Sequence, residues 1–142
     1  MSGFRVGGRD IYGSWGDDNI VGTSGDDFID SGPGDDSIDG GRGRDYIRSG
    51  PGDDYVRGGR GADLIDTGSG DDVVDAGRGD DTINAGSGEN FVDGGDGYDT
   101  LVLDGTPEDW TPGRDQTGEY FENNETTDRT YHRNIENVEF TY

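Results

Sequence analysis

Aliphatic side chains recur at intervals of nine residues between Gly13 and Val102, without an insertion. Each lies in the eighth place of a nine-residue unit whose first six places are rich in Gly and Asp. The aliphatic positions of the ten units are Ile20, Ile29, Ile38, Ile47, Val56, Ile65, Val74, Ile83, Val92 and Leu101. A Gly-rich half that alternates with a short β-prone half predicts a solenoid, because one unit cannot bury an apolar face by itself.

The unit is long enough for one turn and one short strand. We expect places one to six to form the turn and places seven to nine to form the strand. Two units then make one coil of 18 residues, so the ten units predict about five coils and place residues 18 apart side by side. Eighth places are predicted to point into a thin core, and seventh and ninth places to point outward.

The outward positions predict ladders along both faces of such a roll. The ninth places give the acid-base-acid ladders Asp39, Arg57, Asp75 and Asp30, Arg48, Asp66, an order that favours in-register pairing. The seventh places give Phe28, Tyr46, Leu64 on one face and Tyr55, Val73, Phe91 on the other. We interpret these as cross-strand stacking pairs, and a ligand-binding stripe is the alternative.

Two places of the turn carry nearly the same residue throughout. The fourth place is Gly in all ten units: Gly16, Gly25, Gly34, Gly43, Gly52, Gly61, Gly70, Gly79, Gly88 and Gly97. The sixth place is Asp in nine units and Asn90 in the other. Gly allows backbone conformations that bring carbonyl groups together, and calcium takes its ligands from carboxylate and carbonyl oxygens.

The unit Gly-Gly-x-Gly-x-Asp-x-U-x, where U is aliphatic, resembles the RTX (repeats-in-toxin) repeat of hemolysin-type calcium-binding proteins. It can be read directly in residues 58–66 and 94–102, and the resemblance covers 90 of 142 residues. The resemblance implies an all-β fold, a right-handed parallel β-roll (β-solenoid). It also implies Ca²⁺ ions between turns 18 residues apart, held by both sixth-place side chains and by backbone carbonyls of the first four places.

Carried onto this sequence, the resemblance implies about eight Ca²⁺ ions. One edge would pair Asp18 with Asp36, Asp36 with Asp54, Asp54 with Asp72, and Asp72 with Asn90; the other would pair Asp27 with Asp45, Asp45 with Asp63, Asp63 with Asp81, and Asp81 with Asp99. The expected carbonyl ligands are Gly32, Gly34, Gly41, Gly43, Gly50, Gly52, Gly59, Gly61, Gly68, Gly70, Gly77, Gly79, Gly86 and Gly88.

Three positions depart from this ligand pattern. Asn90 keeps an oxygen but lacks a charge, so we expect its site to be the weakest. Ser14 and Thr23 replace Gly at the second place of the first two units, whose outer halves have no repeat partner. Occupancy at that end of the roll is therefore left open.

Other charged places of the turn are not expected to bind metal. The fifth-place acids are predicted to face solvent without ligating: Asp17, Asp26, Asp35, Asp53, Asp71, Asp80 and Glu89. Arg42, Arg60 and Arg78 occupy the third place of alternate units, so three like charges should line one edge. They either offset neighbouring acids or form a site for an anionic polysaccharide.

Composition makes the metal important. Only 26% of the residues are hydrophobic and the net charge is −22, a combination typical of disordered chains. Eight Ca²⁺ ions would reduce this charge to −6 and remove most of the self-repulsion. We therefore expect folding and calcium binding to be one event, with an unfolded metal-free chain. The acidity also argues against a nucleic-acid partner.

Both ends of the chain are expected to close the roll. Residues 1–12 form the predicted N-terminal capping segment, a decayed repeat that contains Phe4, Val6, Ile11 and Tyr12 and has Arg9 at the metal-binding place. The β-roll is assigned to residues 13–105 and a C-terminal capping segment to residues 106–142. There, alternation of Val138, Phe140 and Tyr142 predicts a strand, whereas residues 112–128 are predicted to be loop.

No enzyme or membrane span is expected from the sequence. His132 is the only histidine and is predicted to be a surface residue of an irregular segment, and no nucleophile or metalloprotease motif accompanies it. The chain has no cysteine and no apolar signal region at its start. The resemblance implies a secreted, extracellular bacterial protein exported without a signal peptide.

The sequence thus favours a calcium-binding structural module that folds on Ca²⁺ binding outside the cell and supports export and stability. Neighbouring domains of a larger secreted protein are its expected partners. The alternative is a calcium-dependent carbohydrate-binding or adhesive module, with an anionic glycan held by the Arg edge or by an aromatic face.

Overall fold

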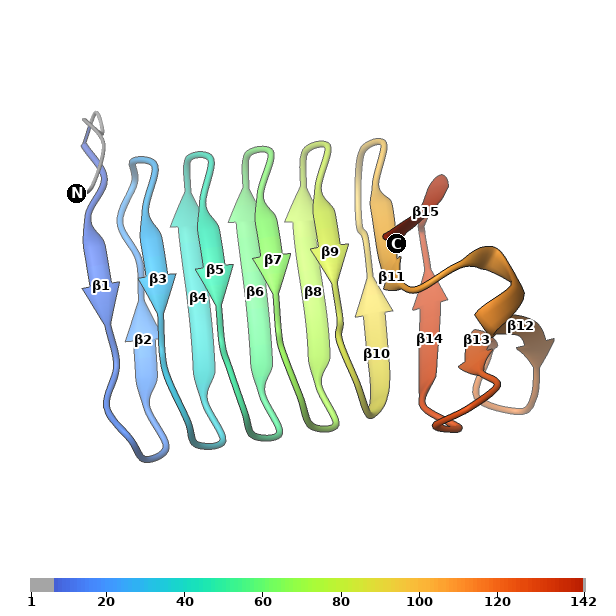
Figure 1. The fold of residues 1–142 in the computed structure, drawn as a ribbon. Helices are drawn as coiled ribbons and strands as arrows, with labels where there is room; N and C mark the ends of the chain where they lie inside the picture. Colours follow the sequence, from blue (N-terminus) through green and yellow to red (C-terminus); the bar gives the residue numbers. More distant parts are fainter. Residues whose placement is uncertain (1–6, 142) are drawn as a thin grey trace.

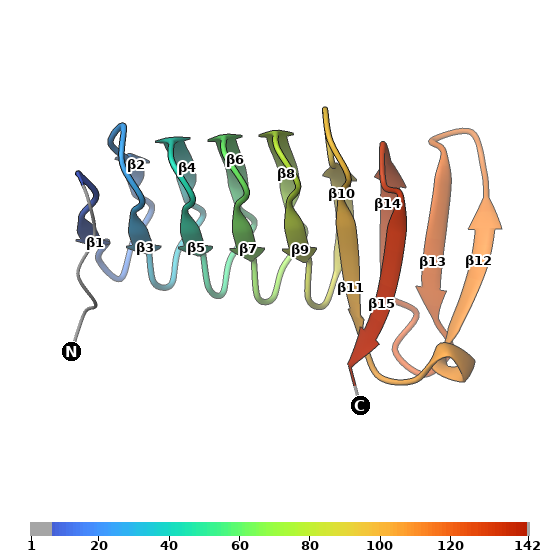
Figure 2. The same ribbon diagram turned by 90° about the horizontal axis from the view of Figure 1, so that it is seen from above.

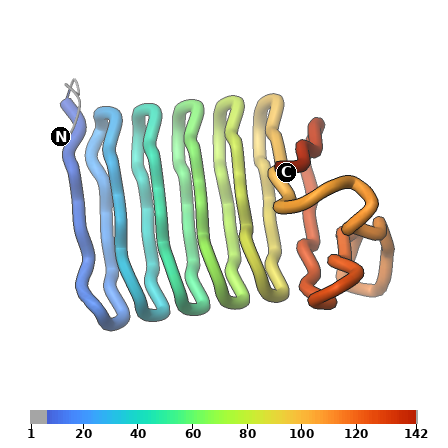
Figure 3. Tube along the Cα trace, viewed as in Figure 1, coloured from blue at the N-terminus to red at the C-terminus, as the bar shows by residue number. Residues whose placement is uncertain are grey.

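The computed structural model describes residues 7–141, and they form two β-sheets wound into one roll (Figure 1). The expectations for Phe4, Val6 and Tyr142 concern positions outside the described residues. Figure 3 shows the chain passing through successive flat coils, from the N-terminal end at the left to the C-terminal end at the right. The only helix among the described residues is the 3-10 turn η1 (Pro107–Asp109), and no helix there is long and apolar enough to cross a membrane.

Alternate strands of the array belong to opposite sheets. The seven-stranded sheet has the order β1 (Asp10–Tyr12), β3 (Phe28–Asp30), β5 (Tyr46–Arg48), β7 (Leu64–Asp66), β9 (Thr82–Asn84), β11 (Thr100–Asp104) and β15 (Asn137–Thr141). The eight-stranded sheet has the order β12 (Trp110–Arg114), β13 (Glu119–Asn123), β14 (Arg129–Arg133), β10 (Glu89–Asp93), β8 (Val73–Arg78), β6 (Tyr55–Arg60), β4 (Ser37–Arg42) and β2 (Asn19–Val21).

The register confirms a parallel β-solenoid of about five coils. Ile20 pairs with Ile38 and Ile29 pairs with Ile47, so neighbouring strands of a sheet are 18 residues apart. The predicted division of the unit is correct for the seven-stranded sheet, whose array strands up to β9 occupy places seven to nine. This division is wrong for β4, β6 and β8, which continue through the third place of the next unit. They are longer because Gly41 pairs with Gly59 and Arg42 pairs with Arg60.

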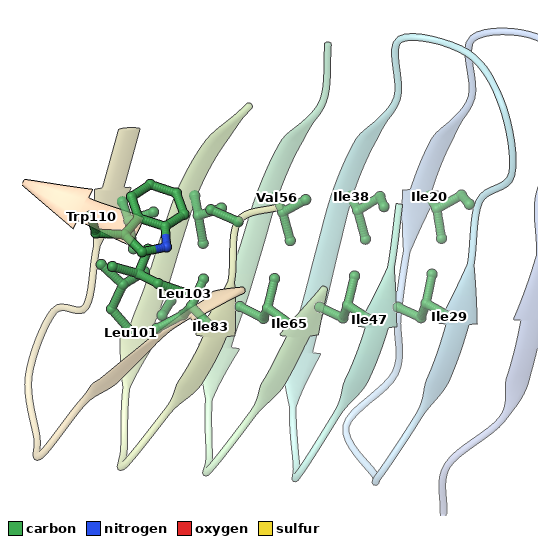
Figure 4. Packing of buried hydrophobic residues seen from close by; sticks show 14 residues of the cluster. Ile20, Ile29, Ile38, Ile47, Val56, Ile65, Ile83, Leu101, Leu103 and Trp110 are labelled. Atoms are coloured by element: carbon green, nitrogen blue, oxygen red, sulfur yellow. The ribbon is translucent and has the colours of Figure 1, made fainter. Parts of the chain in front are cut away.

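The eighth places form the core, as predicted. Ile29, Ile47 and Ile65 are 0% exposed, and Figure 4 shows these side chains in one row opposite a second row that includes Ile20, Ile38 and Val56. Five side chains at the first place are also buried, which the sequence pattern did not indicate: Ser31, Ser49, Thr67, Ala76 and Ala85. Small residues there do not form a hydrophobic period, yet they fill the space between the two rows and the turns.

The hydroxyl groups at the first place are bonded along the roll. Ser31 Oγ donates to the Ser49 carbonyl at 2.8 Å, and Ser49 Oγ donates to the Thr67 carbonyl at 3.0 Å. Thr67 Oγ1 continues the row to the Ala85 carbonyl at 3.0 Å. These bonds satisfy buried polar groups, so a hydroxyl is tolerated inside the roll.

The outward ladders have the predicted register. Arg57 lies between Asp39 and Asp75, with nitrogen to oxygen distances of 3.3 and 4.0 Å. Arg48 pairs with Asp30 at 3.6 Å. On the seventh places, the Phe28 and Tyr46 rings meet edge to face with 5.4 Å between centroids.

The described part of the N-terminal segment continues the repeat, as predicted. Ile11 in β1 pairs with Ile29 in β3. The Arg9 backbone N–H donates to Asp27 Oδ1 at 2.6 Å, which is the contact that a sixth-place residue makes inside the array. Arg9 therefore keeps the backbone role of the sixth place without supplying a carboxylate.

The C-terminal segment adds strands to both sheets. β14 pairs with β10 and β15 pairs with β11, both in parallel, so the prediction of a strand at the end of the chain is confirmed. The loop predicted for residues 112–128 is wrong in part, because β12 and β13 form an antiparallel hairpin, visible at the C-terminal end in Figure 2. Pairing of Pro112 with Phe121 and Gly113 with Tyr120 supplies cross-strand contacts that have no repeat period.

One side chain of this segment lies in a different environment from the predicted one, and another anchors the segment in the core. His132 lies in β14 instead of an irregular segment, and its ring stacks on Phe121 at 5.2 Å, so it is half-buried. Trp110 is buried in the core cluster with Leu103, and its indole N–H donates to the Asp104 carbonyl at 2.9 Å.

Candidate metal centre

The stacked turns bring together all eight expected pairs of sixth-place residues. In each pair the backbone N–H of the earlier residue donates to the side-chain Oδ1 of the residue 18 positions later. The donor to acceptor distances are 2.8 to 2.9 Å for Asp18 to Asp36, Asp36 to Asp54, Asp54 to Asp72, Asp72 to Asn90, Asp27 to Asp45, Asp45 to Asp63, Asp63 to Asp81 and Asp81 to Asp99. This row of bonds fixes one oxygen of each carboxylate.

The second carboxylate oxygen has no such donor in seven of these side chains. The Oδ2 atom is buried and accepts no hydrogen bond in the described part of the chain in Asp36, Asp45, Asp54, Asp63, Asp72, Asp81 and Asp99. A buried anionic oxygen without a donor is costly, so it marks a place for a cation or a proton.

This oxygen faces a backbone carbonyl of the next coil. A β-carbon built on Gly40, a first-place residue, would lie 2.8 Å from Asp45 Oδ2 and 2.6 Å from the Gly58 carbonyl oxygen. At the next coil of the same edge, a β-carbon on Gly58 would lie 2.7 Å from Asp63 Oδ2 and 2.5 Å from the Ala76 carbonyl oxygen. In these glycine-led turns a carboxylate oxygen and a carbonyl oxygen of the next coil therefore lie close to the same first-place residue.

Burial shifts the acidity of these side chains. Loss of hydration raises the pKa of Asp45 and Asp81 from 3.8 to about 7 and the pKa of Asp63 and Asp72 to about 6. Neighbouring carboxylates add to the effect at Asp45 and Asp81, while the backbone N–H bond opposes it. The charged form thus lacks a counter-charge, which a bound cation would supply.

The donor set fits calcium. Among residues 7–141 no three His, Cys, Asp or Glu side chains come together as a metal group. A site between two turns would combine two sixth-place side chains with backbone carbonyls. Such a set contains only oxygens, which suits a hard cation with flexible coordination. Calcium bound there would supply positive charge to the buried carboxylates, and the aspartates and carbonyls named above would hold it.

Glycine at the second and fourth places makes these turns possible. Gly41 and Gly43 have φ values of +100° and +117°, and the other expected carbonyl ligands also have positive φ. Side chains are disfavoured there for a second reason, because a β-carbon on Gly52 would lie 1.9 Å from the Gly34 carbonyl oxygen of the previous coil. Only glycine permits both the conformation and the close stacking of the turns.

The first two turns differ from the others. Ser14 Oγ donates to Asp18 Oδ2 at 3.0 Å, and the Ser14 backbone N–H donates to the same atom at 2.6 Å. Thr23 makes the matching bonds to Asp27 Oδ2 at 3.0 and 2.5 Å. Hydroxyls at the second place thus satisfy the carboxylates within their own turns, where the later units carry glycine.

Asn90 also differs from its neighbours. Its Oδ1 accepts the Asp72 backbone N–H at 2.9 Å, and its Nδ2 donates to the Ala85 carbonyl at 2.9 Å. A nitrogen therefore stands where the aspartates carry a free oxygen. The weakest calcium site stays a prediction for this position.

The fifth-place acids are exposed, and most take part in a second ladder that the sequence did not indicate. The backbone N–H of Asp53 donates to Asp35 Oδ1 at 2.9 Å, and that of Asp71 donates to Asp53 Oδ1 at 2.9 Å. The same contact joins Asp17, Asp26, Asp71 and Asp80 to the fifth-place residue 18 positions later. The direction is opposite to that of the sixth-place row, so each turn is tied to both neighbours.

Arg42, Arg60 and Arg78 stand side by side, as predicted from their places. They line a surface groove that also includes Arg57, Asp39 and Asp96. Within the described part of the chain, Arg78 pairs with Asp96 at 3.7 Å, whereas Arg42 and Arg60 make no ion pair. Three neighbouring cations with one local counter-ion leave a positive strip on an acidic molecule.

The seventh-place apolar stripe of the same eight-stranded sheet ends at the cap. Val73 pairs with both Tyr55 and Phe91, and Phe91 stacks on Tyr131 with 4.9 Å between ring centroids. A groove beside the cap is lined by these side chains. The stacking interpretation accounts for their contacts, and a ligand for this stripe stays a prediction.

Comparison with known families supports the assignment of the repeat. The pattern of the RTX calcium-binding nonapeptide repeat, in four copies, matches residues 12–47, 48–83 and 66–101. A comparison with curated proteins gave no match. The family matches span well over half of the chain. The chain therefore belongs to the RTX calcium-binding nonapeptide repeat family, and it is a calcium-binding repeat module.

Proposed function

We propose that this chain is a calcium-responsive structural module of a secreted bacterial protein, unfolded without calcium and folded on reaching calcium outside the cell. The observation that carries the proposal is the row of seven buried Oδ2 atoms without hydrogen-bond donors. In an array that carries most of the −22 charge, these oxygens oppose folding unless a cation binds between the turns.

The number of ions follows from the pairs of turns. Eight sixth-place pairs would hold up to eight Ca²⁺ ions, with the Asp72 and Asn90 pair the weakest. Of the seven Asp–Asp pairs, those that begin at Asp18 and Asp27 are expected to bind calcium last. Ser14 and Thr23 already donate hydrogen bonds to these two carboxylates. The glycines of the same two turns would contribute carbonyl oxygens.

The module has no proposed catalytic role. A chain that stays disordered at low calcium is suited to export by a route that does not read a cleaved signal peptide, and it then supports the neighbouring domains. Within it we assign residues 13–105 to the calcium-binding roll, with residues 1–12 and 106–142 as the end segments. The continuous sheets favour one cooperative unit.

Circular dichroism during a Ca²⁺ titration of the metal-stripped chain tests this proposal. We expect a change from coil to β-structure with Ca²⁺ and none with equal Mg²⁺, since Mg²⁺ demands a stricter geometry and keeps its water. A β-rich spectrum before any metal is added would refute the coupling of folding to calcium.

The Arg strip favours a second function, the calcium-dependent binding of an anionic glycan. Arg42 and Arg60 have no ion-pair partner among the described residues, and Arg78 has one. A flexible polyanion lying along the third places could contact all three guanidinium groups, each by bidentate hydrogen bonds.

An alginate pull-down with and without Ca²⁺ separates the two functions. Binding that requires Ca²⁺ and decreases in Arg60→Ala, but not in Arg114→Ala, would support the glycan site. Arg114 is a suitable control because it is an exposed arginine at the far end of the cap. Equal recovery of the three proteins would refute the glycan site and leave the structural role as the only proposed function.

A further inference from the structure

The row of turns continues beyond the last repeat into the C-terminal cap. β14 and β15 extend the two sheets past β10 and β11, and the residues between them, 134–136, lie over the turn that ends at Asp99. Thr100 pairs with Asn137 in the parallel ladder of β11 and β15. The cap therefore adds one more turn to this edge of the roll, although this turn has three residues instead of six.

Glu136 occupies the sixth place of this edge. Its Oε2 accepts the Asp99 backbone N–H at 2.8 Å. Asp99 Oδ1 accepts the Asp81 backbone N–H at 2.9 Å in the same way. A carboxylate from a segment without the repeat thus makes the contact that links every sixth-place pair.

Asn134 supplies the carbonyl that the first place supplies elsewhere. A β-carbon built on Gly94 would lie 2.1 Å from the Asn134 carbonyl oxygen and 2.6 Å from Asp99 Oδ2. Gly58, with Asp63 Oδ2 and the Ala76 carbonyl, has the same arrangement inside the array. Asn134 is held in place because its Nδ2 donates to Asp93 Oδ1 at 2.8 Å and its φ is +52°.

Asp99 supplies an oxygen aimed into this space. Its side chain is 0% exposed and its Oδ2 accepts no hydrogen bond within residues 7–141. If the roll simply ended at Asp99, this oxygen would face solvent. The cap instead covers it with a second carboxylate and a carbonyl, an all-oxygen set of the kind that calcium binds.

We propose that Asp99, Glu136 and the Asn134 carbonyl form a further calcium site at the seam between array and cap. The ion would join the cap to the last repeat, so the C-terminal end of the roll closes only when calcium is bound. This inference rests on the proposed calcium-dependent function, and it adds a site that the nonapeptide pattern does not contain.

Native mass spectrometry of the Ca²⁺-saturated full chain counts the ions directly. We expect Glu136→Ala to bind one ion fewer than the wild type, while Glu139→Ala binds the same number. Glu139 is a matched control because it is an exposed glutamate three residues later, in β15, and accepts one hydrogen bond, from Asn137. An unchanged count in a folded Glu136→Ala chain would overturn the site.

A crystal structure of the wild type with Sr²⁺ in place of Ca²⁺ tests the site if Glu136→Ala does not fold. Anomalous density between Asp99, Glu136 and Asn134 would support it, and density only between repeats would overturn it. A wild type that binds no Ca²⁺ at all would instead refute the proposed function, so the two failures are distinguishable.

Discussion

The same residue type has opposite properties in the repeat array and in the C-terminal cap. Asp45 in the array has a pKa raised to about 7 by burial, whereas Asp115 in the cap has a pKa held below 3.8, chiefly by a hydrogen bond from the Tyr131 hydroxyl. Asp115 also lies 3.9 Å from Arg129, which pairs closely with Glu122. The cap thus supplies side-chain donors to Asp115, whereas the array supplies one backbone N–H, that of Asp27, to Asp45.

This difference separates two ways to stabilise a β-structure with few apolar residues. The sixth places of the array stack acids 18 residues apart, so at these places a unit offers no cation to the next. The cap is free of the period, and arginines of the cap lie beside Asp115, Glu119 and Glu122. The metal dependence that we propose would therefore follow from repetition as well as from composition.

Calcium removal has the largest expected effect, and Trp110 reports whether the cap survives it. Trp110 is 8% exposed and Trp15 is 91% exposed, so in Trp15→Phe the emission comes from the cap alone. We expect chelation to shift this emission to longer wavelength together with the loss of β-structure, because Trp110, Val138 and Phe140 pack against the array core. Loss of β-structure with unshifted emission would mean that the cap folds by itself.

Asp63→Asn is expected to raise the Ca²⁺ midpoint by roughly tenfold or more, since removal of a ligand charge weakens binding by about 1.4 kcal/mol or more. Asp63 belongs to two pairs, with Asp45 and with Asp81. The midpoint is read from circular dichroism. Asp53→Asn makes the same chemical change at an exposed fifth place and should shift the midpoint far less; equal shifts would contradict the ligand assignment.

Acidification should weaken calcium binding. Asp45 and Asp81, with pKa values of about 7, and Asp63 and Asp72, with pKa values of about 6, all lie above 3.8. These groups favour the folded metal-free chain below about pH 4, and that contribution is lost as the pH rises through 6 to 7. Calcium must displace the protons of these carboxylates. We therefore expect the affinity for calcium to rise with pH between about 6 and 7, on the order of tenfold per pH unit for each proton that one ion releases. Calorimetry at constant ionic strength measures it; equal affinity at pH 5.5 and 7.5 would contradict this.

The smallest effect is expected on the outer ladder. Arg57→Ala removes contacts with Asp39 and Asp75 whose side chains are more than a third exposed, so the loss should be below about 1 kcal/mol. Thermal unfolding in saturating Ca²⁺ would then shift by no more than about 2–4 °C. A larger shift that persists in high salt would show that the ladder sets the register of the sheets.

Much of the fold could be predicted because a strict period leaves few arrangements. The aliphatic eighth place and the β-prone third of each unit set an 18-residue coil, and the coil places Asp45 beside Asp63 without further information. The first-place hydroxyls and the fifth-place ladder were missed for a different reason. Their roles depend on which backbone groups the neighbouring coil presents, and neither leaves a hydrophobic signal.

The sequence by itself determined the repeat, the parallel pairing, the aliphatic core and the sixth-place row, because each of these follows from contacts that recur every 18 residues. Only the tertiary structure decided how the roll ends. The β12 and β13 hairpin, the stacking of His132 on Phe121, and the contact between Asp99 and Glu136 join residues at separations outside the period. Such contacts are selected by packing and charge at a single place, so no pattern along the chain announces them.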